Sequence, residues 1–302
     1  MLKILIAARL EIYMDIEKYR NLTKSQLLML KAKVVGEVIL TRGRNFIYIP
    51  QRYDSNPEYQ QWMRELEPIH YTSKGRKMVA WMDSEPEKTP ERVWLLFSGN
   101  ASLALHWLPV TSFAPQSADA FVMVEYPGYG KCEGKPSRRA IIDSVDRLIE
   151  TICDRFLISE SQISEMFYVM GSSLGSAIAL QTAARHQIHK GVLVAPFTSV
   201  RDVGAMLFPK FFTYVAADPY DNLARLNEIN QFRHKETHFH IVHGEEDVQL
   251  PIWMGRKLNE SYPDITTLWP VPDAGHNDIK EKQAENLGRA LTNGGDFSLN
   301  SD

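Results

Sequence analysis

Short, continuous apolar runs recur along the chain from residue 93 onwards. The first of them is Val93-Trp94-Leu95-Leu96-Phe97. A run of this length without polar alternation is typical of a strand that is buried on both faces of a parallel sheet. Similar runs cover residues 120–125, 166–170, 191–195, 238–242 and 266–269. We therefore expect these segments to form one parallel sheet.

Segments of helical character lie between these runs. They cover residues 101–107, 139–156, 173–185, 252–262 and 278–291. Before the first run, residues 68–72 and 77–82 are β-rich and flank Ser73-Lys74-Gly75-Arg76, which is a hairpin pattern. Together these features predict an α/β fold with a mostly parallel, doubly wound sheet and an antiparallel hairpin at its start.

The segment before the hairpin lacks this alternation. Thr23-Lys24-Ser25-Gln26 has the form of a capping box and predicts a helix that continues to about residue 33. Short strands are expected over residues 34–40 and 45–49, a loop over 50–57 and a helix over 58–66. We expect residues 1–66 to form an extension packed on the body, 67–292 to form one domain, and 293–302 to form a mobile tail.

The first eight residues are apolar except for Lys3, but Arg9 and Glu11 end the run before it reaches the length of a signal-peptide core. Two interpretations stay open for this segment: an amphipathic helix lying on the body, or peripheral attachment to a membrane or a partner. No apolar run approaches the roughly 18 residues that a membrane span needs. We expect a cytoplasmic protein without a transmembrane segment.

Composition excludes several classes of function. The net charge is −3 and 44% of the residues are hydrophobic, which is ordinary for a soluble globular protein and gives no support to nucleic-acid binding. The two cysteines, Cys132 and Cys153, fit neither a disulfide framework nor a zinc pattern. We expect no metal and no cofactor. The sequence leaves the oligomeric state open.

One strand is followed at once by a turn of small residues, Gly171-Ser172-Ser173-Leu174-Gly175, and then by a helix-favouring segment. This Gly-x-Ser-x-Gly pattern is typical of a sharp strand-to-helix turn that raises a nucleophilic hydroxyl above the sheet. The pattern places Ser173 at the nucleophile position and Ser172 beside it. Flanking glycines let the helix pack close against the strand.

Two later strands are followed by an acidic residue and a histidine. Asp247 follows residues 238–242, and His276 follows residues 266–269. The order serine, acid, histidine predicts a triad in which His276 takes the proton of Ser173 and Asp247 orients the imidazole. Asp247 could instead cap the next helix, with Glu245 or Glu246 as the acid.

The first buried run ends in Ser98-Gly99-Asn100-Ala101. A glycine at this point lets the backbone approach a substrate. The backbone N–H groups of Asn100 and Leu174 are therefore predicted to form an oxyanion hole, the second of them at a helix N-terminus. The alternative is a plain turn and helix cap.

These motifs resemble the single-domain serine hydrolases of the α/β-hydrolase superfamily, and most closely the branch that includes protein-depalmitoylating α/β-hydrolase-domain proteins. The resemblance covers about residues 68–291. It is carried by the serine turn, the two strand-end segments, and the segments 97–101, 125–131 and 274–279. It implies the α/β-hydrolase fold with a small cap insertion, a Ser173, Asp247 and His276 triad, and oxyanion donors at Asn100 and Leu174.

The chain departs from that branch at three points. Ser98 stands where the family usually has histidine, and Leu174 stands where it often has isoleucine. The cysteine-rich, lipidated N-terminus of the animal depalmitoylases is absent. None of these departures removes a triad group, so they bear on substrate preference more than on activity.

The insertion over about residues 197–233 is rich in aromatic residues and methionine. It could line an acyl-binding groove over Ser173, or bury itself against the sheet. The candidate substrate-binding residues are Phe197, Met206, Phe208, Phe211, Phe212 and Tyr129. Cys132, close to the strand ends, is expected to be a bystander thiol.

The sequence therefore favours a serine hydrolase that cleaves carboxylic esters or thioesters of small-molecule or acylated substrates through an acyl-enzyme. A serine peptidase or aminopeptidase is the first alternative, although no obvious acidic cluster would hold a substrate amine. A non-catalytic binding protein on a hydrolase scaffold is the second, and the intact triad argues against it.

A groove lined by the insertion would make activity depend on acyl-chain length. We expect p-nitrophenyl esters of medium chain length to be cleaved faster than the acetate, and Phe211→Ala to erase this preference because it removes an apolar contact with the chain. Steady-state rates over a series of esters measure the effect. An unchanged chain-length profile in the variant would contradict it.

Overall fold

The computed structural model describes residues 47–53, 57–83, 89–114, 118–207 and 218–299. The helix predicted before residue 33 and the strand predicted over 34–40 lie outside these residues. Residues 47–49, expected to end a short strand, do not lie in one.

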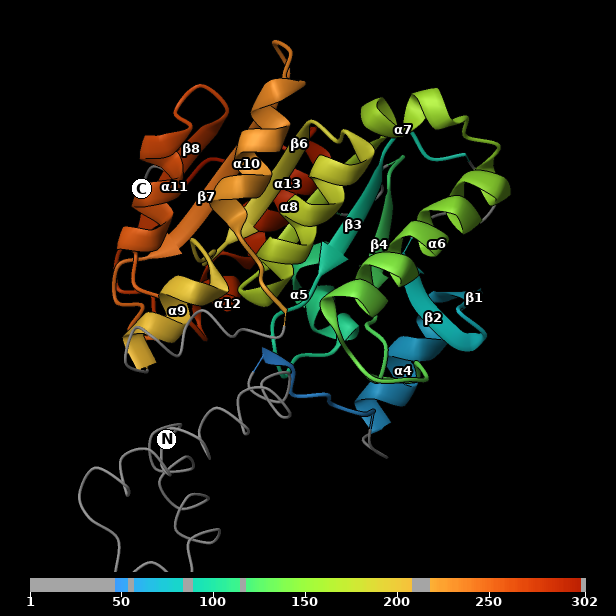
Figure 1. The fold of residues 1–302 in the computed structure, drawn as a ribbon. Helices are drawn as coiled ribbons and strands as arrows, with labels where there is room; N and C mark the ends of the chain where they lie inside the picture. Colours follow the sequence, from blue (N-terminus) through green and yellow to red (C-terminus); the bar gives the residue numbers. More distant parts are fainter. Residues whose placement is uncertain (1–46, 54–56, 84–88, 115–117, 208–217, 300–302) are drawn as a thin grey trace, which may run out of the picture.

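In the described part of the chain, eight strands form one sheet in the order β1-β2-β4-β3-β5-β6-β7-β8 (Figure 1). The bounds are β1 Glu67–Ser73, β2 Arg76–Asp83, β3 Val93–Phe97, β4 Ala120–Val124, β5 Phe167–Ser172, β6 Lys190–Val194, β7 His238–Gly244 and β8 Thr266–Val271. The β1–β2 and β2–β4 pairs are antiparallel, and all the others are parallel. The predicted sheet with an antiparallel start is confirmed.

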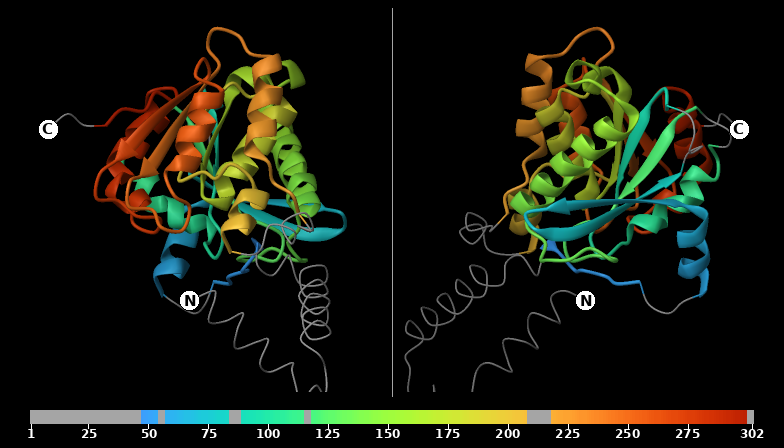
Figure 2. Two further views of the ribbon diagram at one scale, coloured as in Figure 1. Left: turned by 60° about the vertical axis from the view of Figure 1, so that its left-hand side comes forward. Right: turned by 90° about the vertical axis from the view of Figure 1, so that its right-hand side faces the viewer.

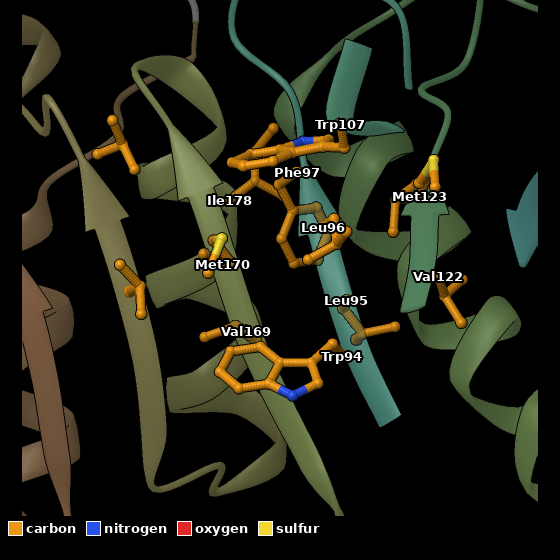
Figure 3. Close-up of a cluster of buried hydrophobic side chains, with 14 of the residues drawn as sticks. Trp94, Leu95, Leu96, Phe97, Trp107, Val122, Met123, Val169, Met170 and Ile178 are labelled. Carbon is orange, nitrogen blue, oxygen red and sulfur yellow. The ribbon is translucent and has the colours of Figure 1, made fainter. Parts of the chain in front are cut away.

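The central strands are buried on both faces, as their continuous apolar sequences require. Every residue of β3 and β4 is buried. Trp94, Leu95 and Leu96 of β3 pack with side chains of β4 and β5, and Trp107 lies over Phe97 at the end of β3 (Figure 3). This cluster is the centre of the hydrophobic core and fixes the position at which β3 and β5 end.

Helices cover both faces of the sheet (Figures 1 and 2). On one face α8 contacts both α6 and α10, and α10 contacts α11; on the other, α5 contacts α12 and α13. The bounds are α4 Pro57–Glu65, η2 Ala104–Trp107, α5 Leu108–Thr111, α6 Arg138–Phe156, α7 Glu160–Met166, α8 Leu174–His186, α9 Val200–Leu207, α10 Asn222–Gln231, α11 Trp253–Ser261, α12 Ile279–Lys282 and α13 Ala284–Thr292.

Two predicted helices differ from the observed ones. The helix expected over 101–107 begins only at Ala104, as the short η2, because Ala101 has a φ of 57° and cannot lie in a right-handed helix. The helix expected over 278–291 is divided into α12 and α13 at Gln283. The sequence patterns did not indicate α7, α9 or α10.

The C-terminal residues 293–299 fall in the segment expected to be a mobile tail. Within it, Phe297 is 3% exposed, and its ring centroid lies 5.7 Å from that of Trp269 on β8. The chain therefore follows the sheet for several residues after α13 ends.

Histidine pairs lie at the starting ends of β6 and β7, away from the serine turn. The rings of His238 and His240 lie 4.8 Å apart, and Nδ1 of His240 accepts a hydrogen bond of 2.9 Å from the Trp269 indole. Burial, followed by the neighbouring His238, lowers the pKa of His240 to about 4. Burial and His234 lower the pKa of His189 to about 4 as well.

These histidines should make the fold less stable in acid. Between pH 6.5 and pH 4 the unfolded chain binds protons that the folded chain does not, so the free energy of unfolding falls as the pH falls through this window. Urea unfolding at several pH values measures the fall. We expect His240→Asn to reduce it, because the variant lacks one of these two imidazoles.

Candidate active site

The turn between β5 and α8 holds Ser173 in a strained conformation. Its φ is 55° and its ψ is −117°, which side-chain-bearing residues rarely adopt. The Ser173 N–H donates to the carbonyl of Val194 on β6 at 2.9 Å, so the turn is fastened to the neighbouring strand. The hydroxyl is therefore presented at the carboxyl end of the sheet, between two parallel strands.

Two glycines make this turn sterically feasible. A Cβ atom at Gly171 would lie 2.2 Å from the carbonyl oxygen of Gly175, and a Cβ at Gly175 would lie 2.0 Å from the carbonyl oxygen of Phe97 on β3. Neither position has room for a side chain. The start of α8 consequently packs in direct backbone contact with β5, which precedes it, and with the neighbouring β3.

Three predicted residues from three segments form a continuous hydrogen-bonded chain. Nε2 of His276 lies 3.0 Å from the Ser173 hydroxyl oxygen, and Nδ1 of the same ring lies 2.7 Å from Oδ2 of Asp247. The Asp247 side chain is fully buried, whereas that of His276 is 13% exposed. The arrangement can carry a proton from the hydroxyl to Nε2 while Nδ1–H stays bonded to the carboxylate.

Asp247 holds its loop as well as the imidazole. Its Oδ1 accepts the backbone N–H groups of Gln249 and Leu250 at 2.9 and 2.8 Å, which leaves Oδ2 for His276. Burial alone would raise the pKa of this carboxyl, but its contacts with His243 and His276 outweigh burial and hold the pKa below its usual range. Glu245 and Glu246, the alternative acids, are exposed.

A second histidine behind the acid was not singled out from the sequence. His243 is fully buried at the end of β7; its Nε2 lies 2.7 Å from the Leu250 carbonyl oxygen and 3.6 Å from Oδ2 of Asp247. It therefore helps fix the loop that carries the acid. The sequence signal that could have identified His243 is its position: it is a polar residue at the end of an apolar strand, directly before Gly244.

The two predicted oxyanion donors belong to segments that adjoin the serine. Leu174 is the first residue of α8. Gly99, which precedes Asn100, approaches Ser173 closely: a Cβ built on it would lie 3.4 Å from the Cβ of Ser173. Ser98 donates to the Leu103 carbonyl at 2.9 Å, and so closes the loop internally.

The predicted substrate-binding residues have different surroundings. Phe197 and Tyr129 are buried, at 4% and 0% exposure, and the Tyr129 hydroxyl accepts the Ile49 N–H. Met206 on α9 is 41% exposed. Phe208, Phe211 and Phe212 lie outside the described residues.

Cys132 is fully buried, and burial raises the pKa of its thiol to about 12. Its sulfur accepts the Val79 N–H at 3.3 Å, so the thiol is used in packing. Among the residues that the structure describes, no group of three or more histidine, cysteine or acidic side chains is arranged to hold a metal ion.

Residues 94–240 match the Alpha/beta hydrolase family. An esterase of Pyrococcus furiosus, Pf2001, has a similar structure, with a TM-score of 0.60 and 17% identity over 82% of this chain and 98% of that one. With the sheet order and the serine turn, these similarities define the α/β-hydrolase fold.

Relatives in sequence include two that differ in how much of this chain they cover. An uncharacterized protein of Mycobacterium tuberculosis, Rv2307c, is 22% identical over 88% of this chain and 91% of its own length. Alpha/beta hydrolase domain-containing protein 17B of Xenopus laevis is 27% identical over 52% of this chain and 50% of its own. None of the described helices is long and apolar enough to cross a membrane.

Replacing Gly175 by alanine should destabilise the protein, because the new methyl group would have to displace the β3 backbone at Phe97. We expect a loss of about 3 kcal/mol in the free energy of unfolding, at the upper end of overpacking effects. Urea denaturation measures it. Gly275→Ala is the matched control, since its Cβ would meet its nearest neighbour at 3.4 Å. An equal loss in the two variants would contradict the explanation.

Proposed function

We propose that the protein is a serine hydrolase that cleaves carboxylic esters or thioesters through an acyl-enzyme. The observation that carries this proposal is the chain of short contacts from Ser173 through His276 to a buried Asp247. A strained serine at a strand-to-helix turn adds to it, because such strain is found where a nucleophile must be presented.

In the proposed reaction, Nε2 of His276 accepts the Ser173 proton as the hydroxyl oxygen attacks the carbonyl carbon of the substrate. The oxyanion that forms is bound by the N–H groups of Asn100 and Leu174. His276 then gives its proton to the leaving alcohol or thiol, and the acyl group remains on Ser173. Water, activated by the same imidazole, releases the acid.

Asp247 would contribute by keeping its charge throughout this cycle. Since its pKa lies below the usual range, the carboxylate is ionised at neutral pH and stabilises the imidazolium that each proton transfer creates. Its two additional backbone hydrogen bonds keep it from turning away from His276.

Ester and thioester substrates are favoured over peptides within this class. Aminopeptidases need a group that holds the substrate amine, and the two acidic residues nearest to Asp247 in sequence, Glu245 and Glu246, are exposed. The partial similarity to protein 17B and the resemblance to depalmitoylating hydrolases support acylated proteins or lipid-like esters as the substrate class.

A fluorophosphonate probe tests the nucleophile directly. We expect the wild-type protein to be labelled and Ser173→Ala to lose both labelling and at least about a thousandfold in kcat/KM for p-nitrophenyl esters. Ser172→Ala is the matched control, because it removes the adjacent hydroxyl and leaves the triad in place. Absence of labelling in the wild type, or equal labelling of Ser173→Ala, would refute the proposal.

A further inference from the structure

Residues 47–53, here called the strap, lie beyond the ends toward which the parallel strands point (blue in Figures 1 and 2). The sequence patterns indicated only a strand end and a loop for them. In the structure the strap makes a series of polar contacts with segments that follow β3 and β4. Those two strands lead into the predicted oxyanion loop, residues 98–103, and into the turn at Gly128 to Gly130.

The first contact joins the strap to the oxyanion loop itself. The Ile49 N–H donates to Oδ1 of Asn100 at 2.7 Å and also lies 3.0 Å from the Tyr129 hydroxyl oxygen. The same Oδ1 accepts the Ala101 N–H at 2.9 Å, where the backbone has a positive φ. The Asn100 side chain therefore links the strap to the turn whose backbone N–H would bind the oxyanion.

The second contact joins the strap to a buried carboxyl. The Tyr53 hydroxyl donates to Oε2 of Glu125 at 2.5 Å, and this carboxyl, directly after β4, is 1% exposed. The backbone of Ala104, the first residue of η2, also acts on this carboxyl and lowers its pKa, against the effect of burial. Glu125 thus joins the strap to the end of the oxyanion loop.

The site around Glu125 has no spare volume. A Cβ on Gly130 would lie 2.2 Å from the Glu125 carboxyl and 2.7 Å from the Tyr53 ring, and Gly130 has a φ of 49°. Burial raises the pKa of Glu125 to about 8, against the opposing effects of Tyr53, Ala104 and Arg52. A buried polar group of this kind is costly unless it is fully hydrogen-bonded, so its partners are held tightly.

Further contacts fix the strap along its length. The Gln51 carbonyl accepts the Gly130 N–H at 2.8 Å, and the Arg52 guanidinium donates to the carbonyls of Gly130 and Cys132. At the other end the hydroxyls of Tyr48 and Tyr220 lie 3.1 Å apart in a buried contact. The strap is therefore held by hydrogen bonds on both sides of Ile49, the residue that contacts Asn100.

We propose that the strap is a positioning element of the active site: through Asn100 and Glu125 it holds the oxyanion loop, and hence the Asn100 N–H, in register with Ser173. This inference rests on the proposed function. Oxyanion donors act only when they are fixed in advance at the place where the charge develops, and small displacements lower the rate steeply. Ground-state binding of the substrate depends much less on that placement.

Tyr53→Phe tests the proposal because it removes one hydroxyl and leaves the ring in place. We expect kcat for a p-nitrophenyl ester to fall about tenfold with KM little changed, since the loss falls on the transition state. We also expect faster hydrogen–deuterium exchange at the amides of residues 99–104. Tyr71→Phe is the control: it removes a buried hydroxyl that bonds to Ser144 on α6 at 3.0 Å, outside the strap and the loop.

Glu125→Gln supplies the second arm. The amide offers one oxygen where the carboxyl group offers two, so it cannot accept from Tyr53 and from Ala104 on separate oxygens, and we expect a similar fall in kcat. If both variants act through the one Tyr53–Glu125 bond, kcat of the double variant should be no lower than that of the more impaired single variant. Additive losses in the double variant would overturn the proposed route through this bond.

The two readouts separate this inference from the proposed function. A wild-type protein that fluorophosphonate does not label would refute the hydrolase assignment, and loop exchange would then decide alone whether the strap holds the loop. Unchanged exchange at residues 99–104 in Tyr53→Phe would overturn the inference. So would an active wild-type protein whose kcat falls equally in Tyr53→Phe and Tyr71→Phe.

Discussion

The rest of the site depends on one close approach, that of the first turn of α8 to the strands beneath it. Gly175 lies where any side chain would collide with the Phe97 carbonyl on β3, and Gly171 lies where one would collide with Gly175 itself. The helix can therefore start directly over the sheet, and Ser173 takes up the strain of the sharp turn. Since β3 continues into the oxyanion loop, this approach also sets how far Asn100 lies from the serine.

The parallel sheet explains why residues distant in sequence meet at this point. Ser173 and His276 are separated by 103 positions and yet lie within hydrogen-bond distance, because β5 and β8 end at the same edge. The loop bearing Asp247 is paired with the loop bearing His276 through the Glu246 N–H and the Ala274 carbonyl at 3.0 Å. The predicted acid and base are thus placed relative to each other by a backbone contact, and the imidazole spans the distance that remains.

The sequence predicted those parts of the structure that follow from local pattern. Residues 93–97 were recognised as a strand because burial on both faces demands an unbroken apolar run, and the observed bounds of β3 are the same. Ser173, Asp247 and His276 could be predicted because each lies in the segment that follows a recognisable strand. The start of η2 was misplaced, since a positive φ at Ala101 depends on a side-chain contact from Asn100 and leaves no periodic signal. Glu125 was passed over for a related reason: its partner Tyr53 lies 72 positions away in an irregular segment.

The strap also bears on where the functional unit begins. A boundary drawn after residue 66, directly before the hairpin, would separate Tyr53 from Glu125 and Ile49 from Asn100. Removing the Tyr53 hydroxyl would leave the buried Glu125 carboxyl with one donor fewer, and desolvated acceptors are strongly destabilising when unpaired. This loss of stability would act on the loop that contacts the carboxyl through Ala104. The same loop approaches Ser173 at Gly99. Residues before the hairpin are in this sense part of the site's architecture, because they bond to polar groups that hold the loop approaching Ser173.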